Sequence, residues 1–350
     1  MITRRELLAL IPAALAMPAA QAPEVSFERI DVHLHIQRSA PVFVAAMEKA
    51  GWRGLSICDC RAVGDEAFDL EKDLQGTLTL HRESKGRIAW AATFDPRLFE
   101  HPDFSSRVIA NLNEYFKQEA VGVKIWKTIG MSIQSKSGKY LMADDPVFFP
   151  IYEAIQKADR VLIAHLADPS GMWLPPRTDN PRTSPSWWNR YGRPGTPSKE
   201  DILLARDRVI AKYPKLRVCG CHLGSNEDNL VALSKRLDTY PNFVVDAAAR
   251  VGNLVSADRE AVRQFMMKYQ DRVAWGVDFN LANNPSDEAG WQSVNAAHER
   301  DWNFFASSGT VVYGGGRAPS REVQGLGLPE SVLRKIYRDN AARWYPGIAG

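Results

Sequence analysis

Residues 29–35 read Arg-Ile-Asp-Val-His-Leu-His, an apolar run that ends on two histidines separated by one leucine. In a β-strand, residues i and i+2 point to the same face, so His33 and His35 share one face of the sheet that this strand joins. Near-continuous apolar runs are typical of parallel strands that are buried on both faces. Further short runs of this kind follow at residues 55–60, 88–94, 121–126, 161–166, 216–222, 243–247 and 273–278.

Amphipathic segments separate these runs and predict helices. They lie at residues 41–49, 104–118, 146–157, 199–212, 229–237, 258–269, 287–305 and 330–344. Eight strands that alternate with helices predict an α/β fold of the (β/α)8 TIM-barrel type. The chain has 350 residues, 45% of them hydrophobic, which is enough for a large core. No linker or composition shift marks a second domain, so we predict one barrel over residues 23–350.

The first 22 residues predict an export signal rather than part of the barrel. Arg4 and Arg5 give a basic start, residues 7–17 are apolar apart from one proline, and residues 20–22 (Ala-Gln-Ala) have the pattern that signal peptidases cut. The paired arginines resemble a twin-arginine signal, with ordinary secretion as the alternative. The apolar run is shorter than the roughly 20 residues that a membrane span needs. We therefore predict a periplasmic or secreted protein without a membrane span.

The charge balance and the cysteines exclude several other classes of protein. Lys plus Arg number 44 and Asp plus Glu 41, and a net charge of +3 carries no signature of nucleic-acid binding. We expect a small-molecule substrate as the partner, and the sequence is compatible with a homo-oligomer. The four cysteines form two C-x-C pairs, Cys58 with Cys60 and Cys219 with Cys221, inside predicted strands. Core thiols are expected there rather than a disulfide or a zinc site, because a chain of this size needs no disulfide framework.

One connection, residues 167–197, is far longer than the others and holds seven prolines, three tryptophans and four arginines. Long loops rich in aromatic residues are usually packed and functional, so we predict a lid; packing over the barrel rim or an oligomer contact is the alternative. Cationic and aromatic side chains there and after the fourth strand suit an anionic, aromatic or sugar-derived substrate. Asp246, which ends the seventh strand, either binds substrate or orients a histidine. The predicted substrate-binding residues are Trp126, Lys127, Trp173, Arg177, Trp187, Trp188, Arg190 and Asp246.

Four of the seven histidines fall at the C-terminal ends of predicted strands, where barrel enzymes hold their catalytic residues. Imidazoles and a carboxylate that converge from several strands suit zinc, manganese or iron(II), of which we expect zinc first. Lys124, in the fourth strand, has the parity to face the same interior. The predicted metal ligands from this pattern are His33, His35, His165, His222 and Asp278, whereas His81, His101 and His298 are expected on the surface.

These motifs resemble the amidohydrolase superfamily, and most closely its amidohydrolase-related branch of hydrolases, lactonases and non-oxidative decarboxylases. The resemblance covers residues 29–346 and rests on Asp31-Val32-His33-Leu34-His35, Lys124, His165, Cys221-His222-Leu223-Gly224 and Gly276-Val277-Asp278, with support from a C-terminal motif over residues 327–343. It implies that His33, His35 and Asp278 bind one ion. His165 and His222 then hold a second ion or are divided between ligand and catalyst.

The resemblance leaves the number of ions open at Lys124. In binuclear members a lysine of the fourth strand carries a carbamate that bridges two ions, so Lys124 is a further candidate ligand. The alternative is an ordinary ammonium that binds a substrate carboxylate or pairs with an acid.

The predicted reaction is hydrolysis of a lactone, ester or amide by metal-activated water. Asp278 is the expected general base, because a carboxylate beside that water can take its proton. If one ion is bound, His222 is expected to donate a hydrogen bond to the developing oxyanion. The alternatives are non-oxidative decarboxylation at the same site and a non-catalytic barrel that binds metal or ligand. A metal phosphoesterase is disfavoured because no extra acidic ligands accompany the two histidines.

Overall fold

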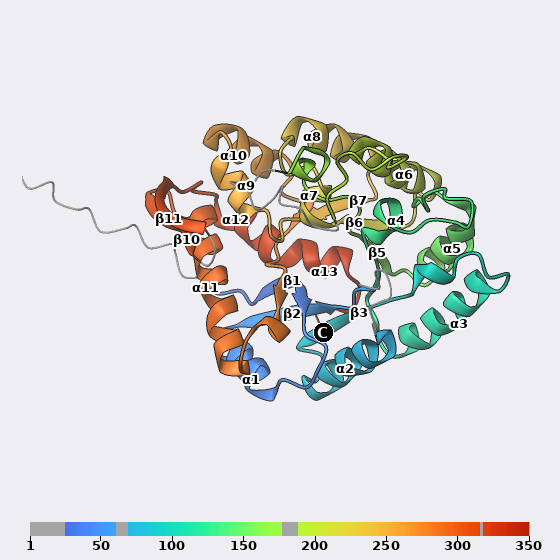
Figure 1. Cartoon of the computed structure of the whole chain (residues 1–350). Helices are drawn as coiled ribbons and strands as arrows, with labels where there is room; N and C mark the ends of the chain where they lie inside the picture. The colour runs from blue at the N-terminus through green and yellow to red at the C-terminus, as the bar shows by residue number, and fades with distance from the viewer. Residues whose placement is uncertain (1–24, 61–68, 177–187, 316–317, 350) are drawn as a thin grey trace, which may run out of the picture.

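A parallel sheet curls around a central axis, and helices surround it (Figure 1). The computed structural model describes residues 25–60, 69–176, 188–315 and 318–349. Within these residues the strands are hydrogen bonded in the order β8-β7-β6-β5-β4-β3-β2-β1-β9. Their bounds are β1 Arg29–His35, β2 Trp52–Ile57, β3 Ile88–Thr93, β4 Gly122–Ile125, β5 Val161–Ala164, β6 Arg217–Gly220, β7 Phe243–Asp246, β8 Val273–Ala274 and β9 Phe279–Asn280.

The barrel closes through a broken eighth strand. Sequence predicted one strand over residues 273–278, whereas the structure has two short pieces, β8 and β9, with Asp278 before the second at a φ of 65°. β8 pairs with β7 and β9 pairs with β1, so the two outermost strands of the sheet are halves of one barrel strand. The predicted (β/α)8 TIM barrel is thereby confirmed.

The predicted helices are present, and most of their ends shift by no more than two residues, as is usual for helix boundaries. The helix predicted from residue 146 begins at Phe149, after a 3-10 turn. Polar side chains cap several of them; Ser198 and Asp201, for example, form a capping box at the start of the helix Lys199–Lys212. The C-terminal segment predicted as one helix divides into α12, a π-helical turn and α13. The α-helices are α1 Pro41–Lys49, α2 Leu70–Glu83, α3 Phe104–Lys117, α4 Thr128–Met131, α5 Phe149–Lys157, α6 Lys199–Lys212, α7 Cys221–Gly224, α8 Leu230–Thr239, α9 Val251–Ser256, α10 Arg259–Lys268, α11 Asp287–Ala306, α12 Glu330–Arg334 and α13 Asn340–Trp344.

Shorter elements complete the chain. An antiparallel hairpin of β10 (Thr310–Gly315) and β11 (Ala318–Gln324), which the sequence did not predict, follows α11. The 3-10 turns and the π-helical turn are η1 Pro96–Leu98, η2 Pro146–Phe148, η3 Ser170–Trp173, η4 Leu281–Asn283 and η5 Lys335–Asp339.

A register shift in β1 sets which side chains face the barrel interior. The shift lies between Asp31 and Leu34 in the pairing with β2. Val32 belongs to the smaller buried cluster, whose members come from alternate strand positions, whereas Leu34 belongs to the large cluster between sheet and helices. The two histidines face inward above Val32, but Asp31 reaches α11, where it contacts His298. In a regular strand Asp31 would share the face of His33 and His35, but the irregularity places it on the opposite face.

Several further expectations can be checked directly. All four cysteines are buried and none forms a disulfide, which confirms the prediction of core thiols. His101 is exposed as expected, but His81 and His298 are only 8% and 1% exposed, so their placement on the surface was wrong. In the described part of the chain, no helix is both long and apolar enough to cross a membrane. The predicted export signal, residues 1–22, lies outside the described residues.

Candidate metal centre

Five predicted ligands meet at the C-terminal mouth of the barrel. The ring centroid of His33 lies 5.2 Å from that of His35 and 4.9 Å from that of His222. The ring centroid of His222 lies 4.4 Å from that of His165. Asp278 Oδ1 lies 3.2 Å from His35 Nε2 and 3.5 Å from His33 Nε2. Its Oδ2 lies 3.9 Å from His222 Nε2. Segments more than 240 residues apart therefore contribute to one cluster.

Hydrogen bonds to the outer nitrogens fix the tautomers of three histidines. The Nδ1 of His35 is 2.9 Å from the Ile57 carbonyl, and the Nδ1 of His222 is 2.9 Å from the Ala248 carbonyl. A carbonyl oxygen can only accept, so Nδ1 carries the proton and the Nε2 lone pair points into the cluster. The same holds for His33, whose Nδ1 is 3.0 Å from the Asp246 carboxylate. Metal-binding histidines commonly have this arrangement.

The donor atoms of the cluster are arranged as a bound cation would need them. Nε2 of His35 and a carboxylate oxygen of Asp278 are both acceptors, yet they face each other at 3.2 Å. The buried Nε2 of His165 has no hydrogen-bond partner among the described residues. Ligand atoms of His33, His35 and Asp278 all lie within 4.8 Å of one another, a spacing that a single ion can bridge. Nitrogen and carboxylate donors in this number fit zinc, manganese or iron(II).

Two candidate ligands adopt left-handed backbone conformations. The φ angle is 61° at His222 and 65° at Asp278, and Leu223 and Ser225 beside His222 also have positive φ. Residues other than glycine seldom adopt this conformation, and such strain concentrates at functional sites. At His222 the chain leaves β6 in a tight turn, α7, that directs the imidazole back over the barrel mouth.

The surroundings set the protonation states that metal binding needs. Burial lowers the pKa of His222 to about 3, and burial together with His222 lowers the pKa of His165 well below its ordinary value. Burial alone would raise the pKa of Asp278, but the neighbouring histidines hold it well below the usual range. Near neutral pH His165 and His222 are therefore neutral and Asp278 is ionised.

These shifts predict how the stability of the metal-free protein depends on pH. The folded-state pKa of His222, about 3, lies below the unfolded value. As pH falls below about 6.5, the unfolded chain binds the proton first and the folded state loses stability. Between about pH 6.5 and pH 4.5 the His222 side chain alone should lower the free energy of unfolding by about 2–3 kcal/mol.

Urea unfolding of the metal-free protein at those two pH values measures this effect. In His222→Gln the pH dependence of the unfolding free energy should shrink by about that amount. His101→Gln, at an exposed histidine, is the matched control and should keep the wild-type dependence. Equal pH dependence in His222→Gln and the wild type would show that His222 is not held neutral.

Asp246 lies beneath the histidines rather than in the open mouth. Its side chain is fully buried, Oδ2 accepts from His33 Nδ1, and Oδ1 accepts from the backbone amides of His222 at 2.7 Å and Ala248 at 3.2 Å. Burial would raise the pKa of Asp246, but the bond from His33 holds it low, so the carboxylate stays an acceptor. This place suits orientation of His33 and His222, the second of the two predicted roles. Both oxygens already accept hydrogen bonds from the protein, and binding of substrate by Asp246 stays a prediction.

Lys124 lies at the base of the cluster and is 1% exposed. Its Nζ donates to Cys221 Sγ at 3.3 Å, lies 3.4 Å from His33 Nε2, and is 3.8 Å from Asp59 Oδ1. Burial alone would lower the pKa of Lys124, but Cys221 and nearby acids raise it above its ordinary value. These are surroundings of an ammonium, the second of the two predicted states, and the carbamate stays a prediction.

The cationic and aromatic residues predicted for substrate form a wall beside His165. The Trp126 and Trp188 ring centroids are 5.1 Å apart, and Trp126 lies 6.3 Å from His165. Lys127 Nζ lies 4.0 Å from the Trp188 centroid, within cation–π range. It is not a free cation, because both oxygens of Asp168 accept from it at 2.9 and 2.8 Å. Asp168, which was not among the predicted site residues, comes three residues after His165.

The described ends of the predicted lid are tied to the protein. Trp173 Nε1 donates to the Pro197 carbonyl at 3.0 Å. The Arg190 guanidinium, 4% exposed as a residue, donates to the carbonyls of Trp188 and Met131. Arg190 therefore anchors the loop, and its role in substrate binding stays a prediction. Arg177 and Trp187 lie outside the described residues.

The Lys127–Asp168 pair should couple strongly because both side chains are at most 12% exposed. In a double-mutant cycle of Lys127→Met and Asp168→Asn, we expect a coupling free energy of about 1–3 kcal/mol in urea unfolding. The matched pair Lys268 and Asp238 has similar geometry, at 3.0 Å, but each side chain is more than half exposed. Its coupling should be much weaker, because solvent screens an exposed ion pair. Equal coupling in the two pairs would contradict this burial argument.

A cavity of about 650 Å³ opens directly on Asp278. Asn280, Asn283 and Asn284 line one side, and Arg300 of α11 lines another. Asn280 is the register partner of His35, so both side chains project from the same face of the sheet. The Asp278 side chain is 31% exposed, and water can therefore reach it. No local sequence pattern marks this cavity, because the cavity depends on the break between β8 and β9.

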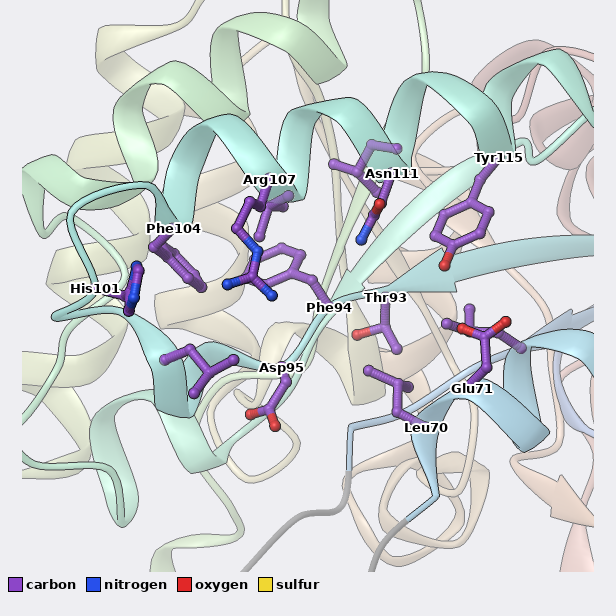
Figure 2. A pocket seen from close by; sticks show the side chains of 14 residues that line it. Leu70, Glu71, Thr93, Phe94, Asp95, His101, Phe104, Arg107, Asn111 and Tyr115 are labelled. Carbon is purple, nitrogen blue, oxygen red and sulfur yellow. The ribbon is translucent and has the colours of Figure 1, made fainter.

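Another cavity, of about 240 Å³, lies between α2 and α3 (Figure 2). Phe94, Phe104 and Tyr115 supply rings to it, and Arg107 and Asn111 extend from α3. It contains none of the predicted site residues. The candidate metal ligands lie in the histidine cluster and not in this cavity.

The barrel and its mouth define the class of protein. Parallel strands within a ring of helices, with histidines and an aspartate at their C-terminal ends, form an amidohydrolase-type TIM barrel. The chain belongs to the amidohydrolase family, whose sequence profile matches residues 30–347. Family membership supports an enzyme that acts on a small molecule and uses a divalent metal.

Solved structures share this fold at low sequence identity. A dihydroxybenzoic acid decarboxylase from Polaromonas sp. JS666, with bound manganese and the inhibitor 2-nitroresorcinol, is similar at a TM-score of 0.52 and 14% identity, over 91% of this chain and 97% of that chain. A 2,6-dihydroxybenzoate decarboxylase from Rhizobium is similar at 0.50 and 14% identity, over 91% and 98%. At this identity they show the fold alone. A search of curated proteins gives no match.

Proposed function

We propose that this protein is a metal-dependent hydrolase that cleaves a lactone, ester or amide bond of a small substrate. One observation carries the proposal. Three imidazoles present Nε2 lone pairs to an ionised carboxylate that is open to solvent through a large cavity. Buried acceptors that face one another are stabilised by a bound cation, and the exposed carboxylate has access to water.

His33, His35 and Asp278 would hold the ion, and His222 and His165 would complete the site. Zinc fits these donors best, with manganese or iron(II) as alternatives. A bound ion supplies Lewis acidity, which polarises a substrate carbonyl and makes water more acidic. His222 fits a ligand rather than a donor to an oxyanion, because its proton lies on Nδ1 and its low pKa leaves Nε2 bare.

Asp278 is the proposed general base. Its low pKa keeps the carboxylate ionised at neutral pH, and its exposed fraction of 31% lets it contact a water molecule. The carboxylate takes the proton of the attacking water and returns it to the leaving group. Asp246 keeps the proton of His33 on Nδ1 and so keeps its Nε2 available.

The polar cavity beside Asp278 is the proposed substrate site. Side-chain amides of Asn280 and Asn283 can both donate and accept hydrogen bonds, which suits a hydroxylated or carbonyl-rich ligand. We place this activity in the periplasm, on the basis of the twin-arginine-like signal in residues 1–22.

Non-oxidative decarboxylation is the second candidate. The wall formed by Trp126, Trp188 and Lys127 beside His165 favours an aromatic substrate. The charge of Lys127 does not favour an aromatic carboxylate, because Asp168 already neutralises it.

Turnover assays separate the two reactions. The metal-loaded protein is incubated with panels of lactones, esters and amides, and in parallel with carboxylated arenes whose release of carbon dioxide is followed. We expect hydrolysis that stops on chelation and returns with zinc or manganese. Decarboxylation without any hydrolysis would replace the first proposal by the second.

A further inference from the structure

A buried carboxylate joins the two backbone segments that carry the proposed ligands. Asp31 is fully buried, and its Oδ1 accepts from the backbone amides of His33 at 2.9 Å and Val277 at 3.2 Å. His33 is a proposed ligand, and Val277 immediately precedes another, Asp278. One carboxylate oxygen therefore fixes the spacing between β1 and the β8–β9 break.

Few other bonds hold the segments together at this point. Besides the pairing of β1 with β9, backbone hydrogen bonds run from Val32 to the Trp275 carbonyl at 3.1 Å and from Asp278 to the His33 carbonyl at 2.9 Å. The approach is close: a Cβ on Gly276 would lie 2.9 Å from the His33 Cβ and 3.2 Å from Asp31 Oδ1. Asp31 thus supplies, through a side chain, the bond to Val277 that a regular ladder would provide.

The second oxygen of Asp31 is held from the helix layer. His298 Nε2, on α11, donates to Asp31 Oδ2 at 3.0 Å, and His298 is 1% exposed. Its ring centroid lies 3.9 Å from that of Trp52, 5.0 Å from Trp275 and 6.1 Å from Trp291. Its Nδ1 has no hydrogen-bond partner in the part of the chain that the structure describes. The bond to Asp31 is therefore the polar contact that gives this buried imidazole an orientation.

We propose that His298 is a positioning residue for the metal centre. It acts through Asp31 and keeps His33 and Asp278 at the distance from each other at which both can bind one ion. The inference rests on the proposed function for its metal ligands, but the link between the segments can be measured without metal. Loss of the donor frees Asp31 to rotate, which weakens its bonds to the amides of His33 and Val277. The ligands then sample wider spacings and bind an ion less well.

Two substitutions separate the hydrogen bond from packing. His298→Phe keeps a ring among the three tryptophans but has no donor, whereas the His298→Gln amide can reach Asp31 Oδ2. Trp291→Phe is the matched control, since it trims the packing and leaves the bond. If His298 only fills space, the Phe variant should resemble the wild type and the Gln variant should be worse. The proposal predicts the reverse order.

Hydrogen exchange and metal titration give the two readouts. In the metal-free protein, the amides of His33 and Val277 should exchange at least about tenfold faster in His298→Phe than in the wild type, with His298→Gln and Trp291→Phe close to the wild type. Zinc or manganese, titrated alone by equilibrium dialysis, should bind about 10- to 100-fold more weakly to His298→Phe. Unchanged exchange in His298→Phe, or equal acceleration in the Gln variant, would overturn the proposal. If the wild type binds no ion but exchange follows the predicted order, the proposed function fails and the positioning link stands.

Discussion

Replacement of Asp278 by Asn is expected to lower kcat/KM by about 10²–10⁴-fold, the range typical of a lost general base. Asn has nearly the same size and keeps one oxygen, but it cannot take a proton from water. The carboxylate at this position is ionised at neutral pH because the surrounding histidines lower its pKa. Its partial exposure gives it the contact with solvent that His33 and His35 lack.

Kinetics and ion content should be measured on the same sample of Asp278→Asn. We expect the ion to be largely retained, because the histidines remain. Asp95→Asn is the matched control: Asp95 also follows a barrel strand, but its carboxylate caps η1 and pairs with Arg97. Wild-type kcat/KM in Asp278→Asn would refute the role of Asp278 as the base.

Replacement of Asp246 by Ala is expected to weaken metal binding by about 10- to 100-fold, since an outer partner of a ligand histidine is lost. It should also lower the free energy of unfolding by about 3–5 kcal/mol, because buried donors lose their charged acceptor. Those donors are His33 Nδ1 and the backbone amides of His222 and Ala248. Ion titration and urea unfolding measure the two effects.

Asp246→Asn gives a graded comparison. The Asn side chain has one carbonyl oxygen and one amide NH2 group. If the oxygen accepts from a backbone amide, the NH2 group faces His33 Nδ1; if the oxygen faces Nδ1, it is a weaker acceptor than a carboxylate. Its metal affinity should fall between that of the wild type and that of Asp246→Ala. Wild-type ion affinity in both variants would show that Asp246 does not orient His33.

The barrel was predictable because each strand carries its own signal. A short apolar run flanked by an amphipathic helix needs only local sequence, and the histidines at the strand ends could be placed by counting along each run. His165, for example, follows the inward-facing Val161 and Ile163 at two-residue spacing. The cluster of predicted ligands follows from this regularity together with the rule that parallel strands end at one rim.

The departures arise where the backbone is irregular or the partner is distant in sequence. The register shift in β1 turned Asp31 out of the barrel, and the turn at Asp278 split the last strand. His298 was misplaced because its partner, Asp31, is 267 residues away and nothing local marks the contact. Lys127 and Arg190 were predicted to bind substrate. The sequence does not reveal that Lys127 pairs with Asp168 or that Arg190 donates to backbone carbonyls.

The central claim is that His33, His35 and Asp278 hold a metal ion. A crystal structure of the protein purified without chelator, with anomalous data collected at the absorption edge of the ion found by elemental analysis, tests it most directly. We expect an anomalous peak about 2.0–2.2 Å from the Nε2 atoms of His33 and His35 and from an oxygen of Asp278. Density at Lys124 Nζ would also distinguish an ammonium from a carbamate. A folded protein with no peak at this cluster after incubation with zinc, manganese and iron(II) would show that these residues hold no metal ion.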